Sequence, residues 1–338
     1  MMSKTWQKPL LAVLLALAII FPMFAANDYY IYVMSLAYIM AIAAVGLNLI
    51  LGYTGQLNLA HAGFMAIGAY TVGILTVDYG VPYWVAFVIA GLLSAVIGFF
   101  AGLLSLRLKG HFFSIFTLCV GFMIYLIIEK WDTLTHGTVG IIDIPAPTGI
   151  GPIRFDNTWS QYYLVLFFLV VSLWLMSRIV HSLLGRAFIA IRNGEDLAET
   201  LGINLMRTKV LAFVLSTFYA GMAGALYAGF VRFIGPAMAL ESHTFDMIAF
   251  ILVGGIGTLF GPLLGAILLT WLTQSLQFLQ DFRMIVFGPL LILLVMYFPQ
   301  GLIGYWRERQ ARRAAASMQD RRLQRSVIGS QQEVGTNA

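Results

Sequence analysis

Long apolar runs separated by short polar segments make up most of the chain. Most of the runs approach the length of about 20 residues that an α-helix needs to cross a bilayer. Lipid offers no hydrogen-bond partner to an open backbone, so each run is expected to be helical. The pattern predicts an all-α polytopic membrane protein with about ten transmembrane helices. The predicted spans are 10–26, 30–51, 57–77, 83–106, 112–128, 161–181, 208–230, 245–259, 262–280 and 284–302.

Composition supports a membrane protein. Of the 338 residues, 60% are hydrophobic and only 10% are charged, and the mean hydropathy is +0.87. A soluble domain carries about 25% charged residues, so a water-soluble shell around this much apolar surface is excluded. The single cysteine, Cys119, lies inside an apolar run, so the chain forms no internal disulfide.

Basic residues indicate which side of the membrane each segment faces. With the N-terminus inside and ten spans, 16 of the 20 Lys and Arg fall in cytoplasmic segments, as the positive-inside rule requires. An odd number of spans would put the arginine-rich C-terminal tail outside. We therefore predict that both termini are cytoplasmic.

The same pattern divides the chain into three regions. Residues 1–29 hold an N-terminal segment with the first span, 30–305 form the membrane domain, and 306–338 form a basic tail. The first span resembles a signal peptide, but Met23-Phe24-Ala25 is a poor cleavage site, so we expect a retained helix. The tail has the charge to touch anionic lipid or RNA, but we interpret it as a topology anchor.

The chain lacks the residue patterns of an enzyme or of an ion-driven carrier. No Asp, Glu, Lys or Arg lies in the middle of a predicted span, whereas carriers use such groups to couple ions. There is no Gly-x-x-x-x-Gly-Lys loop to hold nucleotide phosphates, and the five histidines are scattered. We predict no catalytic residue, no metal and no cofactor. Uphill transport would draw its energy from another subunit.

A polar, glycine-punctuated stretch runs from Gly46 to Gly63. Polar side chains are costly at membrane depth unless they pair or face a cavity, and glycines permit a broken helix there. One interpretation is a helix break that lines a solute path; the alternative is a cytoplasmic turn, and the residues alone leave both open. Whether 254–262 is a turn or a re-entrant break is open as well. The candidate path residues are Asn48, Gln56, Asn58 and His61, with Gly52 and Gly55 at the break.

Small residues recur at helical spacing. Gly98 and Gly102 form one Gly-x-x-x-Gly pair, and Gly257, Gly261 and Gly265 repeat at the same interval. Such stripes let helices approach closely, so we assign these glycines to helix packing or to a break. Segments 52–63 and 254–265 also share the pattern Gly-x-x-Gly-x-Leu-x-x-x-x-x-Gly, which we ascribe to chance in glycine-rich sequence rather than to duplication.

Residues 182–207 form the longest cytoplasmic segment between spans. Asn193 is a favourable N-cap, and Gly202 suits the position after a helix C-terminus, so a short helix is expected over 194–201. Leu197 and Leu201 make one face of this helix, which needs a surface to dock on. Arg186 and Arg192 lie in the flanking interfacial stretch, and Glu195, Asp196 and Glu199 lie on the helix.

Four ordered blocks of the sequence resemble the permease subunits of branched-chain amino acid ABC transporters. The blocks are Gly46-Leu-Asn-Leu-Ile-Leu-Gly-Tyr-Thr-Gly-Gln-Leu-Asn-Leu-Ala-His-Ala-Gly-Phe, Asn193-Gly-Glu-Asp-Leu-Ala-Glu-Thr-Leu-Gly-Ile-Asn, Ala220-Gly-Met-Ala-Gly-Ala-Leu-Tyr-Ala and Gly254-Gly-Ile-Gly-Thr-Leu-Phe-Gly-Pro-Leu-Leu-Gly-Ala. The likeness covers about 30–305 and is greatest to the longer, LivM-type subgroup. Asn58 departs from a common Ser, and Asp246 from a common apolar or Glu residue.

This resemblance implies an ABC importer permease-like fold in a bacterial inner membrane. It implies a second permease subunit, two cytoplasmic ATPases, a periplasmic binding protein and contact with membrane lipid, but no nucleic acid. It also implies that Arg186, Arg192, Glu195, Asp196, Glu199 and Gly202 couple the chain to the ATPases. Branched-chain amino acids are the expected cargo and urea or short amides the nearest alternative. An autonomous carrier or a membrane enzyme is the rival from another class.

Overall fold

A computed structural model describes residues 16–108, 110–149, 155, 157–275 and four isolated positions, 288, 296, 301 and 304. Residues 16–24 are helical, and no strand occurs among the described residues, where the one β-bridge pairs Ile141 with Ile234. The α-helices are α2 Asp28–Asn48, α3 His61–Gly73, α4 Tyr83–Ser105, α5 His111–Lys130, α6 Asp132–Thr135, α7 Thr158–Val180, α8 Leu183–Asn193, α9 Glu195–Thr200, α10 Leu205–Val231, α11 Glu241–Gly254 and α12 Gly261–Ser275. Short π- or 3-10 turns lie at Leu49–Tyr53, Ile74–Asp78, Gly137–Val139 and Pro236–Ala239.

Five helices in the described part are long and apolar enough to cross a membrane: α2 with its π-turn, α4, α5, α7 and α10. They coincide with the predicted spans 30–51, 83–106, 112–128, 161–181 and 208–230. Run length predicts these helices well because one helical rise of 1.5 Å per residue sets the span of each. The protein is therefore mostly helical, as expected.

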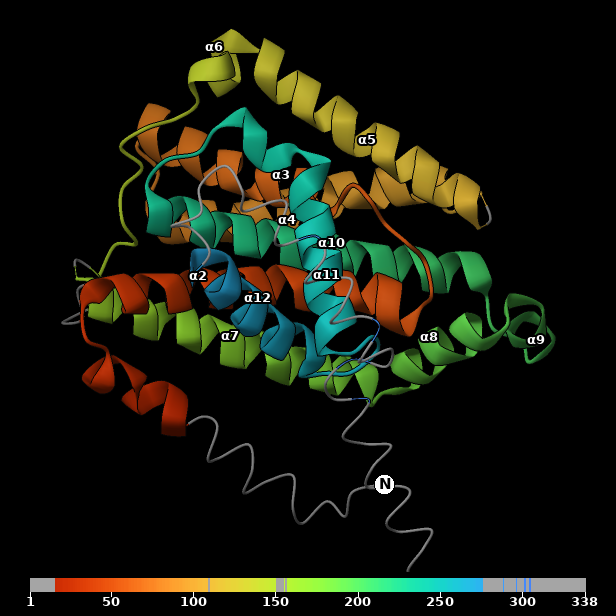
Figure 1. Ribbon diagram of the computed structural model, residues 1–338. Coiled ribbons are helices and arrows are strands. Elements are labelled where there is room, and N and C mark those ends of the chain that lie inside the picture. The colour runs from red at the N-terminus through yellow and green to blue at the C-terminus, as the bar shows by residue number, and fades with distance from the viewer. Residues whose placement is uncertain are drawn as a thin grey trace, which may run out of the picture.

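The count of about ten spans is not confirmed, and the remaining predicted spans differ from the structure. The span predicted at 57–77 is helical only from His61, since an irregular segment precedes α3. The span predicted at 245–259 is the 14-residue α11, and α12 has 15 residues. Figure 1 shows α11 running steeply across the direction shared by α4 and α7. The span predicted at 10–26 is described from residue 16 and is helical over 16–24, whereas 276–280 and most of 284–302 lie outside the described residues.

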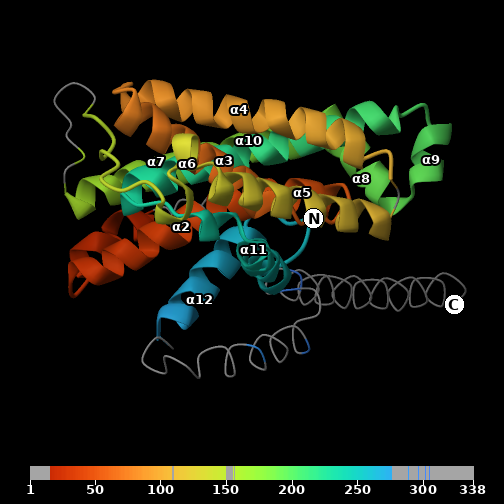
Figure 2. The same ribbon diagram turned by 90° about the horizontal axis from the view of Figure 1, so that it is seen from above.

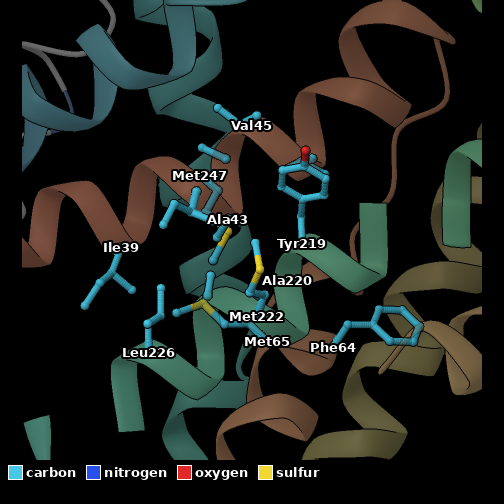
Figure 3. Close-up of a cluster of buried hydrophobic side chains, with 14 of the residues drawn as sticks. Ile39, Ala43, Val45, Phe64, Met65, Tyr219, Ala220, Met222, Leu226 and Met247 are labelled. Carbon is cyan, nitrogen blue, oxygen red and sulfur yellow. The ribbon is translucent and has the colours of Figure 1, made fainter. Parts of the chain in front are cut away.

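Helices α2 and α10 form the centre of the bundle and α5 lies at its edge. The most apolar window is 83% buried in α2 and 72% in α10, but only 22% in α5. Figure 3 shows side chains of α2, α3, α10 and α11 meeting in this core, among them Ala43, Met65, Leu226 and Met247. The outward face of α5 keeps large apolar side chains exposed, as a lipid-facing surface would.

Glycines bring α10 close to α3 and α4. A Cβ on Gly68 would meet the backbone of Gly221, and one on Gly98 would meet the side chain of Thr217. A Cβ on Gly102 would come to 3.2 Å from Phe213. The stripe predicted from spacing therefore lies at a real helix contact, where the missing side chains let two backbones approach.

The two ends of the bundle carry different structures. Helices α8 and α9 form one end, as Figures 1 and 2 show. The opposite end holds α6 and the bridge between Ile141 and Ile234, with two backbone hydrogen bonds of 2.9 and 3.0 Å. Because α2, α4 and α7 end on the side of the bundle where α8 and α9 lie, we refer to this side as the coupling end.

Candidate functional site

Two glycine-rich helix breaks, the first at 52–55 and the second at 254–261, meet at Asn48 at the coupling end of the bundle. The Asn48 side-chain amide donates to the carbonyl of Thr258 at 2.8 Å and accepts from the backbone N–H of Gly257 at 3.0 Å. A Cβ on Gly52 would collide with the Asn48 side chain and with the nitrogen of Gly257. One buried amide thus joins residues that lie more than 200 positions apart in the sequence.

The two copies of the shared glycine pattern have one backbone conformation in common. Gly55 and Gly257 hold the same position in the pattern, and both are left-handed, with φ of +79° and +68°. Residues with a Cβ rarely adopt this conformation, which is one reason for glycine at both positions. Segment 254–261 is a turn between α11 and α12, closed by the Thr258 hydroxyl, which donates to Gly255 and accepts from the N–H of Gly261.

The segment after the first break is more than a turn, because it runs back into the bundle. His61 Nε2 lies 2.9 Å from the carbonyl of Ala43, which is almost three helical turns before Tyr53, about 15 Å along the helix. On the way, the N–H of Leu59 donates to Thr117 of α5 at 3.1 Å. The irregular backbone is thus covered by protein, which is the condition for such backbone at membrane depth.

The polar side chains of this segment are enclosed. Asn58 and His61 are fully buried and Gln56 nearly so. The side-chain oxygen of Asn58 accepts from the backbone N–H of Ala60 at 3.0 Å. Asn58 Nδ2 and His61 Nδ1 have no partner within the described structure. A buried polar atom without a partner is costly, and these two nitrogens are the atoms near the break that lack one. Asn48, by contrast, is fully committed to the other break.

The coupling end carries the predicted cytoplasmic helix, with corrected boundaries. Asn193 is the last residue of α8 and Gly194 is the N-cap of α9, so the prediction of Asn193 as N-cap is wrong. The stretch around Arg186 and Arg192 is itself the helix α8. It is continuous up to Asn193 because its apolar positions, such as Phe188 and Ile191, are buried against the bundle. Gly202 has φ of +82° and follows the end of α9, as expected.

Three polar contacts tie this helix pair to the bundle, two to the segment of the first break and one to α10. The Arg192 guanidinium donates to the carbonyl of Gly52. Glu195 forms an ion pair with Lys209 of α10 at 2.6 Å and accepts from the Gln56 amide at 3.0 Å. Sequence reasoning treated Lys209 only as a topology charge and missed this pair, although a lysine at the start of a long apolar helix is a signal that a partner is needed.

The remaining predicted coupling residues face outward. Arg186, Asp196 and Glu199 are exposed, and so are the apolar side chains of Leu197 and Leu201, at 65% and 71%. The structure therefore separates the six predicted residues into two groups. The charged groups of Arg192, an exposed residue, and of half-buried Glu195 make contacts within the protein, whereas the other side chains lie on the open surface of α8 and α9.

The other predicted glycines lie where α11 crosses α12. A Cβ on Gly265 would meet the carbonyl of Phe250, and one on Gly261 would meet Thr258 and the carbonyl of Gly255. Metal binding has no candidate here: the described residues hold no group of three or more His, Cys, Asp or Glu side chains placed to bind an ion.

Comparison with known proteins identifies the family. The sequence profile described as "branched-chain amino acid transport system / permease component" matches residues 29–295. The chain belongs to this permease family. It is 35% identical over 328 residues to the high-affinity branched-chain amino acid transport system permease protein LivM of Escherichia coli, covering 89% of this chain and 76% of LivM. LivM of Salmonella typhimurium is also 35% identical.

More distant members of the permease family broaden its range. The high-affinity branched-chain amino acid transport system permease protein LivH of Escherichia coli is 24% identical over 294 residues, covering 78% of this chain and 91% of LivH. The autoinducer 2 import system permease protein LsrC of an Enterobacter strain is 28% identical over 278 residues, covering 78% of this chain and 77% of LsrC. No solved structure matches the chain.

Proposed function

We propose that this chain is a translocation subunit of an ATP-driven importer for branched-chain amino acids. The observation that carries the proposal is the exposed, leucine-bearing α9 at one end of a permease-family chain, joined by α8 to a helix break inside the bundle. Such a helix suits docking to a cytoplasmic ATPase. Similarity to LivM over 89% of the chain supports the cargo.

The proposed assembly follows from this role. The chain pairs with a second permease, most simply a different one related to LivH, and with two cytoplasmic ATPases and a periplasmic binding protein. It has no ATPase activity of its own. It lies in the bacterial inner membrane with ten spans, both termini and the 182–207 segment cytoplasmic. The split of basic residues, 16 of 20 on the inner side, supports this topology.

The proposed path passes the first helix break. Asn58 and His61 carry the unpartnered nitrogen atoms near the break, and Gln56 lies between them and the coupling end. Separation of the two breaks would uncover these groups for a polar solute. Asn48 is also part of this path, and its role there is to hold the two breaks together. Arg186, Asp196, Glu199 and Gly202 are proposed to form or shape the ATPase-docking surface.

Two alternatives remain distinct from this proposal. Urea or short amides are the nearest alternative cargo, and LsrC illustrates that relatives carry other solutes. An autonomous secondary carrier would need a buried carboxylate to couple ions. The acidic side chain nearest the break, Glu195, is paired with Lys209 instead.

Reconstitution tests the proposal. The chain is purified with its partner permease, ATPases and binding protein and placed in proteoliposomes with labelled leucine. Uptake is expected only when ATP is present on the side of the membrane that the ATPases face. Unlabelled leucine, isoleucine and valine should compete with the labelled leucine, and urea should not. Uptake by this chain alone, driven by a proton gradient, would replace the proposal with the carrier. Competition by urea instead of valine would change the cargo.

A further inference from the structure

Two groups of contacts connect the helix pair α8–α9 to the interior of the bundle. One is the hydrogen bond from Arg192 to the Gly52 carbonyl. The other is the cluster of Glu195, Lys209 and Gln56, which we call the inner latch. The latch joins α9, α10 and the irregular segment after the first break, so it spans the coupling end from the surface helix to the candidate path.

The ion pair in the inner latch is short and largely buried on the lysine side. The Lys209 side chain is only 5% exposed, and its ammonium group lies 2.6 Å from the Glu195 carboxylate. A buried ammonium is costly without a partner, so moving α9 away from α10 would leave an uncompensated charge. The Gln56 amide supplies a second donor to the same carboxylate oxygen. A displacement of α9 is therefore resisted unless Gln56 and the start of α10 move with it.

Arg192 contacts both glycine breaks. Its side chain donates to Gly52 and passes beside Gly55, where an added Cβ would lie 3.3 Å from Arg192 Cγ. An added Cβ on Gly257 of the second break would collide with the same guanidinium. Because the Asn48 side chain bonds to Gly257 and packs against Gly52, the two breaks and Arg192 form one packed unit. Any rotation of α8 is passed to both breaks through the arginine.

The inward contacts make Arg192 and Glu195 poor candidates for direct ATPase docking. Their functional groups are occupied within this chain, whereas Leu197 and Glu199 present an open surface on the same short helix. Building on the proposed function, we propose that Arg192 and the inner latch are positioning residues that pass the ATPase-driven displacement of α8–α9 to the two glycine breaks. Docking and transmission are then separate properties of neighbouring side chains.

A charge swap in the complete transporter tests the proposal. Variants Glu195→Lys and Lys209→Glu are compared with the double variant that carries both. Lys130→Glu is the matched control, because it reverses the charge of an exposed lysine that pairs with Glu129 away from the coupling end. The readouts are ATPase co-purification, ATP hydrolysis, and leucine taken up per ATP hydrolysed. Each single swap should lower uptake per ATP at least tenfold while the ATPases still co-purify and hydrolyse ATP. The double variant should recover most of the loss, because it restores the pair in reverse.

Arg192→Met and Arg192→Lys extend the test to the second link and remain informative if a charge swap prevents folding. Met removes the donor to Gly52, so uptake per ATP should fall at least tenfold, and Lys should rescue it in part. Unchanged coupling in the single swaps and in Arg192→Met would overturn the proposal, as would loss of ATPase co-purification in these variants. If the wild-type complex shows no ATP-dependent uptake at all, the proposed function itself fails.

Discussion

At the residue scale, Asn48 is the polar side chain on which the arrangement of the two breaks depends. It satisfies a backbone carbonyl and a backbone N–H of the second break with one amide. A carboxylate or a hydroxyl in its place would serve only one of the two well, because the site needs a donor and an acceptor about 2 Å apart on one planar group.

Replacing Asn48 by leucine should destabilise the protein. Leucine has the same number of side-chain heavy atoms but leaves Gly257 and Thr258 without their partners, and each unsatisfied buried group costs about 1–3 kcal/mol. The thermal unfolding midpoint in mild detergent should therefore fall clearly. Ser35→Ala is the control on the same helix, since the Ser35 hydroxyl only bonds back to Ile31 at 2.8 Å. Equal midpoints for the two variants would contradict the bridging role.

The limits of sequence reasoning are visible at this scale. Asn48, Gln56, Asn58 and His61 stand out because polar residues within apolar sequence need a reason. Their partners do not stand out, since Gln56 and Glu195 are 139 positions apart and Thr258 contributes only its backbone carbonyl to Asn48. Polarity in an apolar run predicts that a contact exists, but only the fold determines which residue supplies it.

At the element scale, the sequence predicts the length of a helix better than its direction. Run length predicted the five long helices because it measures how far a helix extends. It could not predict that α11 crosses the bundle, since direction depends on the neighbours against which a helix packs (Figure 1). It also placed the start of α3 too early. Residues 57–60 continue the apolar run, but their backbone is irregular, and the N–H of Leu59 donates to Thr117 of α5.

Gly261 is the element-scale test of the α11–α12 crossing. Leucine at this position would drive a side chain into the carbonyl of Gly255 and into Thr258. Overpacking of this kind costs about 1–3 kcal/mol or more, so assembled complex and uptake should both fall. Leu263→Ile, a volume-conserving change on the same helix, should be mild. Normal assembly and uptake with Gly261→Leu would remove this glycine from the packing stripe.

Glu199 tests the outward face of α9. It lies near the C-terminal end of the helix, where the helix dipole disfavours an acid by about 0.3–1 kcal/mol. For the helix alone, Glu199→Lys is thus neutral or slightly stabilising. If Glu199 docks on a basic ATPase surface, the same change should reduce ATPase co-purification and uptake at unchanged expression. Wild-type values for both quantities would show that Glu199 is only a solvated acid.

At the scale of the whole molecule, all the predicted coupling residues gather at one end, with the two breaks beside them. The bridge between Ile141 and Ile234 closes the other end. The charge distribution along the sequence predicts that the coupling end faces the cytoplasm, since basic segments gather on one side of a membrane, and this orientation stays a prediction. The lengths of the described helices do not confirm the predicted number of spans, because α3, α11 and α12 are short.

Thiol labelling of intact cells tests the orientation. Cys119 is exposed on α5 and is first replaced by serine. Single cysteines then replace Thr138, which is exposed at the end opposite α9, Asn193 at the coupling end, or Ser326 in the basic tail. With an impermeant reagent, only the cysteine at 138 should react. Reaction at 326 but not at 193 would mean an odd number of spans.

The burial of Lys209 gives the chain a built-in chemical reporter. An acylating reagent modifies a lysine only when it can reach the amine, and the Lys209 side chain is 5% exposed and held against Glu195. Lys130, with a side chain 73% exposed, reacts from the start and serves as the internal reference. Mass spectrometry of the ratio of the two acylated peptides would therefore record, without any mutation, how often the protein opens at α10 while it turns over.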